Sequence, residues 1–351
     1  MVMPAQTKFR LPDPLAQWRW PRALNPHYEE VKPESEAWLH GFETLDVKSQ
    51  RSFDRCNFAL LGCLAYPLAD KDRLRVACDL MALFYVFDEF TDNVDGKGTR
   101  EYAEIVVNAL RNPHHDRPLG EAKLGEVTRQ FWLRAMQKSC ASAQERFIAS
   151  FAEYAYAVID EASDRAKGSV RTIKEYLRLT RLTAGPYPCF FPIEMDLDIP
   201  DEVMTHPSMQ MMRSLAAESL VLGNDLYSYN IEQAAGHGGH NIITVVMNEN
   251  GVNLDAALDW VSEYHEQVLS QFQAQYRILP SWGPTIDLKV SAYVERLAYF
   301  IRGIDCWAFE TERYFGKKGR EIQKDRIVNL LPRAEAVVTP MMVPIGREFD
   351  I

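Results

Sequence analysis

The sequence predicts an all-α protein built as a single helical domain. Apolar residues recur at spacings of three and four over long segments, while alternating, strand-like runs are nearly absent. The middle of the 351-residue chain has neither a Gly/Ser linker nor a repeat of fixed period. A hydrophobic share of 47% supplies enough apolar material for a sizeable core. We therefore expect one large helical bundle rather than two domains.

Residues 1–33 are expected to form an extended N-terminal strap. Six prolines fall in this segment, and proline supplies no backbone donor and biases its predecessor away from helix. Trp18, Trp20 and Tyr28 would anchor the strap by packing on the core. The first helix is expected to begin at Glu34, because Pro33 and the acids after it are typical of a first helical turn.

Apolar periodicity, bounded by Pro, Gly, Asn or Asp, predicts the helices that follow. They cover residues 48–66, 70–90, 99–111, 121–138, 142–164, 172–185, 207–235, 254–278 and 288–315. Clusters of Pro, Gly, Asn and Asp predict surface loops at 112–120 and 196–201. The helical domain then spans residues 34–335, and residues 336–351 form a C-terminal tail that is poorly ordered or packed on the surface.

Composition limits the kinds of molecule that the protein is expected to bind and the cellular compartment in which it is expected. A formal net charge of −10 argues against binding to nucleic acid or to an anionic membrane surface. No apolar stretch reaches eighteen residues, which predicts no membrane span, and residues 1–10 lack the apolar run of a signal peptide. The six cysteines are scattered without a CxxC pair, as expected for reduced thiols. We expect a cytoplasmic monomer or homodimer.

The first candidate site follows a strongly apolar segment, residues 81–87. Asp88 and Asp92 lie four residues apart and therefore on one helix face, near a carboxyl end where the helix dipole disfavours negative charge. A cation would offset this cost, and Mg²⁺ is typically held by one or two carboxylates. Taken alone, the pattern also fits a solvated acidic helix end that stops at Gly96.

The second candidate site lies 136 positions further along the chain. Asn224, Ser228 and Glu232 step by four and form one oxygen-bearing stripe on a helix. An amide oxygen, a hydroxyl and a carboxylate are ligands that a second Mg²⁺ accepts. Alone, this stripe also fits a polar helix face, but the two patterns together favour two helices facing one cavity.

These residues resemble the motifs of class I terpene synthases. Among these enzymes, the sequence is most similar to the fungal, basidiomycete-type sesquiterpene synthases. Residues 88–92 resemble the aspartate-rich motif, and 224–232 resemble the Asn/Ser/Glu metal triad. Further blocks in the expected order are residues 9–13, 25–28 and 176–185, His240–Asn241, and Trp307 ahead of Arg313–Tyr314. The resemblance covers nearly the whole chain.

The resemblance implies a helical bundle around a deep apolar pocket, with three Mg²⁺ ions and a prenyl diphosphate, farnesyl diphosphate above all, at its mouth. It implies the following site residues: Asp88, Asp92, Asn224, Ser228 and Glu232 for metal; Arg181, Arg313 and Tyr314 for diphosphate; Phe84, Phe87, Gly185 and Trp307 for the pocket. Arg178, one turn earlier, competes with Arg181 as the diphosphate sensor.

The implied activity is Mg²⁺-dependent ionisation of farnesyl diphosphate, followed by cyclisation of the carbocation to a sesquiterpene hydrocarbon or alcohol. A chain-elongating prenyltransferase is disfavoured, because it needs a second aspartate-rich motif where this chain has the Asn/Ser/Glu stripe. The sequence also leaves open a non-catalytic helical scaffold. A metal hydrolase based on His237 and His240 has weaker support, since their glycine loop lacks a third ligand.

Overall fold

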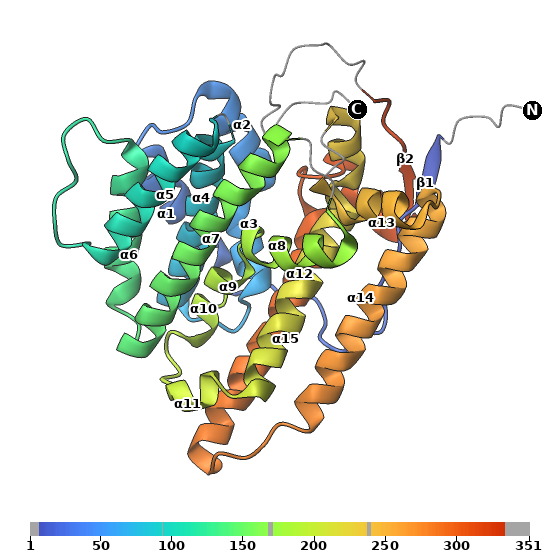
Figure 1. The fold of residues 1–351 in the computed structure, drawn as a ribbon. Helices are drawn as coiled ribbons and strands as arrows, with labels where there is room; N and C mark the ends of the chain where they lie inside the picture. Colours follow the sequence, from blue (N-terminus) through green and yellow to red (C-terminus); the bar gives the residue numbers. More distant parts are fainter. Residues whose placement is uncertain (1–6, 93, 168–170, 237–239, 334–351) are drawn as a thin grey trace, which may run out of the picture.

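The computed structural model describes residues 7–92, 94–167, 171–236 and 240–333. Within them the chain is helical apart from one pair of short strands, which confirms the all-α prediction (Figure 1). In chain order the elements are β1 (Lys8–Arg10), α1 (Tyr28–His40), α2 (Val47–Cys56), α3 (Phe58–Ala65), α4 (Lys71–Thr91), α5 (Gly96–Arg111), α6 (Lys123–Met136), α7 (Ala141–Lys167), α8 (Ile173–Thr183), α9 (Pro186–Cys189), α10 (Phe191–Glu194), α11 (Asp201–Met204), α12 (Pro207–Ala235), α13 (Ile242–Asn250), α14 (Leu254–Arg277), α15 (Pro284–Glu310), η2 (Gly316–Lys318), α16 (Gly319–Asp325) and β2 (Ile327–Asn329).

The helices form two groups joined by shared packing. In one, α4 contacts α1, α3, α5 and α6, and α7 packs on α5; in the other, α12 packs on α14 and α15. The pairs α3–α15, α7–α8 and α8–α12 connect the groups, and α8 to α10 lie between them in Figure 1. One hydrophobic cluster runs through both groups, so the bundle has a continuous core.

Several helix boundaries differ from the predicted ones. The helix expected over 48–66 is two helices, because Asn57 adopts a left-handed backbone with φ 45° and its side chain caps α3. The first helix begins at Tyr28 rather than Glu34, so Pro33 lies inside it. The cause is Asn25, which accepts hydrogen bonds from the backbone N–H groups of His27 and Tyr28 and so starts the turn earlier. The strap therefore ends before residue 28.

The short strands fix the strap in place. β1 pairs with β2 in antiparallel register, with Phe9 opposite Val328. Trp18 is buried, and its indole N–H donates to the carbonyl of Ala298 on α15 at 3.1 Å. Three-residue strands carry too little alternation to be recognised from sequence, and their pairing depends on segments more than 300 residues apart.

Two further departures lie beside the candidate site. The helix expected over 172–185 ends at Thr183, and Gly185 then adopts φ 66°, which reorients the chain into α9. The helix expected to reach residue 315 ends at Glu310, so Arg313 and Tyr314 lie in a turn after α15. The sequence prediction missed α13 entirely, whereas α12 begins and ends where it was expected.

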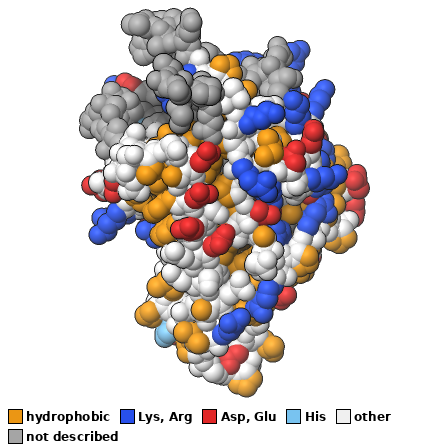
Figure 2. Space-filling view, turned by 90° about the vertical axis from the view of Figure 1, so that its right-hand side faces the viewer, with side chains coloured by type: hydrophobic (Ala, Val, Ile, Leu, Met, Phe, Trp, Pro, Cys, Tyr) orange, Lys and Arg blue, Asp and Glu red, His pale blue; other side chains and the backbone are white. Residues whose placement is uncertain are grey.

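The surface mixes charges of both signs. Figure 2, which shows the side carrying the strands, α13 and α14, has Lys and Arg side chains close to Asp and Glu, with hydrophobic atoms scattered between them. Among the described helices, none combines the length and the apolar character that a membrane crossing requires. All six cysteines are free thiols, as predicted, and five of them are buried. The predicted tail, 336–351, and His237 lie outside the described residues.

Candidate active site

The carboxyl end of α4 carries the first pair of acids. Asp88 is partly buried, and its Oδ1 accepts a hydrogen bond from the hydroxyl of Tyr154 on α7 at 3.1 Å. Burial raises the pKa of Asp88 to about 8, and the neighbouring charge of Asp92 adds to the rise. The last turn of α4 contains no basic side chain. Within α4 itself, no basic side chain therefore offsets the helix dipole and these two carboxylates.

Glu89, between the two aspartates in sequence, points elsewhere. Its Oε2 accepts a hydrogen bond from the Ser49 hydroxyl on α2 at 2.6 Å. A glutamate here is tied to the neighbouring helix and leaves Asp88 and Asp92 as the pair on the site face.

The second set of oxygens lies on α12, as the spacing predicted. Ser228 is buried, whereas Asn224 and Glu232 are partly buried along the same face. The amide nitrogen of Asn224 donates to the Tyr314 hydroxyl at 2.8 Å, which leaves its Oδ1 available as a ligand. Burial raises the pKa of Glu232, while hydrogen bonds from Asn241 and Ser228 and the charge of Arg313 oppose the rise.

Arg313 and Tyr314 connect the two acidic helix ends. The Arg313 guanidinium is close enough to lower the pKa of both Asp88 and Glu232 against the effect of burial. It also contacts the Cys56 thiol at 3.7 Å and lies 5.7 Å from the ring of Tyr314. The structure thus brings together residues from α4, α12 and the turn after α15, which lie up to 226 positions apart in the chain.

Several residues in the site carried no prediction. Tyr154 binds Asp88 but lies 66 positions away, so no local pattern could reveal it. Asn241 donates to Glu232, and Tyr176 donates to Asp225 within the triad segment. The negative charge of Glu161 on α7 raises the pKa of Asp88, Glu232 and Asp225. A further carboxylate therefore lies near both acidic helices. The recognised sequence blocks contain Tyr176, Asp225 and Asn241, but they give no sign of Tyr154 or Glu161.

The two competing arginines of α8 have different surroundings. Arg181 is partly buried, and its Nη1 lies 3.2 Å from the Ser214 hydroxyl and 3.4 Å from Glu218 Oε2, both on α12. Glu218 also accepts a hydrogen bond from Tyr264. Arg178 is exposed. Arg181 is therefore the one attached to the triad helix.

The predicted pocket residues form two aromatic groups. Phe84 and Phe87 on α4 pack against Tyr154 with ring centroids 5.1 Å and 5.5 Å away, and the backbone of Gly185 lies against the first ring. Trp307 is buried on α15, with its ring centroid 5.7 Å from that of Tyr314, and its indole N–H donates to the carbonyl of Cys56. The first group thus supports Asp88 and the second supports the Arg313–Tyr314 turn.

The donor chemistry fits a hard divalent cation. Aspartate, glutamate, amide and hydroxyl oxygens are the ligands that Mg²⁺ prefers, and two helix carboxyl ends face the same space. In the part of the chain that the structure describes, no three His, Cys, Asp or Glu side chains converge into a metal site by themselves. Mg²⁺ sites commonly complete their octahedron with waters and substrate phosphate.

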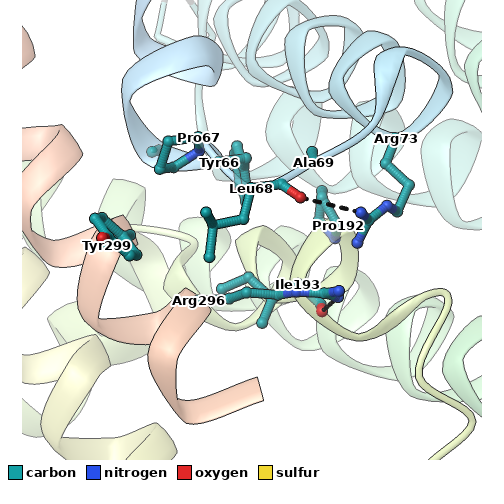
Figure 3. A pocket seen from close by; sticks show the side chains of 10 residues that line it. Tyr66, Pro67, Leu68, Ala69, Arg73, Pro192, Ile193, Arg296 and Tyr299 are labelled. Carbon is teal, nitrogen blue, oxygen red and sulfur yellow. Dashed lines mark hydrogen bonds between the residues drawn. The ribbon is translucent and has the colours of Figure 1, made fainter. Parts of the chain in front are cut away.

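A separate small pocket lies at the other end of α4, between the α3–α4 loop, α10 and α15 (Figure 3). Arg73 and Arg296 point toward it, but both guanidiniums pair with Asp196, at 2.9 Å and 2.6 Å, and Arg73 also pairs with Asp70 at 2.9 Å. Arg73 precedes Asp88 by fifteen helical residues, or about 22 Å. This pocket is therefore remote from the acidic site, and its positive charges are already neutralised.

Comparison with known proteins identifies what this arrangement resembles. The family model described as terpene synthase family 2, C-terminal metal binding, matches residues 79–271, a range that contains both acidic helix ends. The chain is 45% identical to sesquiterpene synthase 14 of Postia placenta, over 93% of each chain. It is 47% identical to a Delta(6)-protoilludene synthase of Armillaria gallica, over 92% of this chain and 94% of that relative.

Solved structures share the fold at much lower sequence identity. An a-eudesmol synthase matches with a TM-score of 0.75 at 20% identity, over 83% of this chain and 97% of that one. A linalool/nerolidol synthase from Streptomyces clavuligerus matches with a TM-score of 0.73 at 18% identity, over 83% and 98% of the two chains. These likenesses show the all-α fold of the bundle.

Proposed function

Because this chain belongs to the terpene synthase family, we propose that it is a Mg²⁺-dependent sesquiterpene synthase. Its substrate would be farnesyl diphosphate, and its product a sesquiterpene hydrocarbon or alcohol. The observation that carries the proposal is the meeting of two acidic helix ends beside Arg313 and Tyr314. Several relatives are named Delta(6)-protoilludene synthases, which makes that hydrocarbon the first product to look for.

The acidic residues supply the metal-binding half of the site. Asp88 and Asp92 would hold two of three Mg²⁺ ions, and Asn224, Ser228 and Glu232 the third. When bound, Mg²⁺ supplies Lewis-acid stabilisation of the charge that develops on the departing diphosphate. Carboxylates suit this role here, because the anionic substrate binds an acidic protein through cations that the protein recruits.

The cationic residues supply direct hydrogen bonds to the leaving group. Arg313 would donate its guanidinium N–H groups to diphosphate oxygens, with the Tyr314 hydroxyl beside it. Arg181 would approach from α8, and its attachment to Glu218 keeps it close to the triad helix. These donors would bind the diphosphate more strongly as its charge increases, which favours ionisation over ground-state binding.

The aromatic residues would protect the carbocation after ionisation. Such a cation must be kept from water, and aromatic faces attract positive charge by about 0.5–2 kcal/mol per contact. Phe84 and Phe87 pack against Tyr154, which binds Asp88, and Trp307 packs against Tyr314. These are therefore the rings that we assign to this role.

Incubation with farnesyl diphosphate tests the proposal, with and without Mg²⁺, with products identified by gas chromatography and mass spectrometry. A sesquiterpene that appears only with Mg²⁺ is expected, and no terpene above the metal-free control would refute the function. Addition of isopentenyl diphosphate tests for a chain-elongating prenyltransferase, which would yield a longer prenyl diphosphate instead.

Substitution of the ligands tests the metal assignment separately. Asp88→Ala and Glu232→Ala should each abolish most turnover while circular dichroism shows unchanged helix content. Retained activity in both variants would remove these residues from the site.

A further inference from the structure

Asn241 is a fully buried polar residue between α12 and α13, and the proposed chemistry does not use it. It is 0% exposed and precedes α13 as its N-cap, with an extended backbone at φ −138° and ψ 133°. Its Oδ1 accepts from the backbone N–H of Ile243 at 3.0 Å. This contact is an ordinary helix cap, which Ser, Thr or Asp could also provide.

The other half of the Asn241 amide points at the metal triad. Its Nδ2 donates to the Asp225 carbonyl at 2.8 Å and to Glu232 Oε2 at 3.0 Å, and lies 3.4 Å from the Ser228 hydroxyl. A capping serine, threonine or aspartate has no N–H group that could replace these bonds. The Asn241 side chain therefore caps α13 and, at the same time, contacts the two proposed metal ligands Glu232 and Ser228.

The segment around Asn241 is itself held on α12. The Asp225 carboxylate accepts from the backbone N–H of Ile242 at 2.9 Å and from the Tyr176 hydroxyl of α8 at 2.7 Å. Asp225 and Tyr176 are both buried. Asn241 therefore has little freedom to move, and its amide can hold the Glu232 side chain in one orientation.

We propose that Asn241 is a positioning residue that fixes Ser228 and Glu232 for metal binding. Its hydrogen bond to Glu232 Oε2 would limit the orientations in which this carboxylate, together with the neighbouring Ser228 hydroxyl, could bind a cation. Groups that orient metal ligands in this way commonly affect metal affinity by about 10–100-fold when removed. The inference rests on the proposed Mg²⁺-dependent function.

The test compares Asn241→Ser with Asn253→Ser. Serine retains a helix cap at both positions, and Asn253 caps α14, a different helix from the triad helix, through the Ala256 N–H at 3.0 Å. Each protein is melted with fixed inorganic pyrophosphate over a range of Mg²⁺ concentrations, and turnover of farnesyl diphosphate is measured over the same range.

We expect the Mg²⁺ concentration that gives half of the melting shift to rise at least about 10-fold in Asn241→Ser and less than about 2-fold in Asn253→Ser. Excess Mg²⁺ should restore much of the turnover of Asn241→Ser, which a purely structural defect would not allow. If that variant does not fold, Asn241→Thr, which keeps a helix cap and nearly the same volume but lacks the amide N–H donors and adds no charge, should show the same weakened Mg²⁺ response.

Two outcomes are decisive against the proposal and are distinguishable. Equal Mg²⁺ dependence in wild type and the folded Asn241 variant would overturn the positioning role alone. A wild-type protein with no Mg²⁺-dependent shift would overturn the proposed function and this inference together.

Discussion

The buried His265 predicts a specific loss of stability in acid. It is 1% exposed on α14, its Nε2 lies 2.8 Å from the Ser219 hydroxyl, and its Nδ1 has no hydrogen-bond partner in the described structure. Burial lowers the pKa of His265 to about 3, whereas an unfolded chain has an imidazole pKa of about 6.5. Between these values the unfolded state binds one proton more than the folded state.

The sign and magnitude follow from this difference. Stability from this group is complete above about pH 6.5 and decreases as the pH falls, by about 1.4 kcal/mol per unit until the folded pKa is reached. The free energy of unfolding should therefore drop by about 1.4 kcal/mol at pH 5.5 and about 2 kcal/mol at pH 5.0 through this residue alone.

Urea unfolding of wild type and His265→Gln at pH 7.5, 5.5 and 5.0 measures the effect. The glutamine amide can still reach Ser219 but does not titrate, so the stability difference between the two proteins should change by about 2 kcal/mol in favour of the variant on acidification. His114→Gln, at an exposed loop position, is the matched control and should show no such change. A wild-type-to-variant difference that is constant with pH would refute the reasoning.

Three more predictions concern the site. Gly185→Ala should destabilise the fold by about 2–5 kcal/mol, measured by thermal melting. A Cβ at φ 66° costs about 1–2 kcal/mol, and because this Cβ would lie 2.9 Å from Phe84, overpacking adds about 1–3 kcal/mol. Tyr154→Phe should keep the aromatic packing but weaken Mg²⁺ binding about 10-fold in the pyrophosphate melting assay, because Asp88 loses its donor. Arg181→Gln should reduce turnover far more than Arg178→Gln, because only Arg181 is attached to the triad helix; steady-state kinetics decide the ranking.

Each of these has a control or a contrary outcome. Tyr66→Phe removes a buried phenol hydrogen bond to the Cys189 carbonyl, remote from Asp88, and should leave Mg²⁺ binding unchanged. An unaltered melting temperature in Gly185→Ala would mean that the turn between α8 and α9 tolerates a side chain at this position. A greater loss in Arg178→Gln would move the diphosphate sensor one turn earlier.

Local patterns predicted the parts of the site that lie within one helix. The spacing of Asn224, Ser228 and Glu232 placed them on one face, because the period of an α-helix is set by its own backbone. The same reasoning placed Asp88 at a helix carboxyl end. Two boundary errors arose where a single side chain overrides periodicity, as Asn57 and Asn25 do by capping or starting a helix.

The sequence by itself determined the all-α class, the two oxygen-rich helix faces and, through its motifs, the family of the protein. Only the tertiary structure decided that Tyr154 binds Asp88, that Asn241 binds Glu232 and that Arg313 lies near enough to Asp88 and Glu232 for its charge to lower the pKa of both carboxyls. The physical reason is that hydrophobic periodicity is encoded within a few turns of chain, whereas these contacts join segments brought together by packing of the whole bundle.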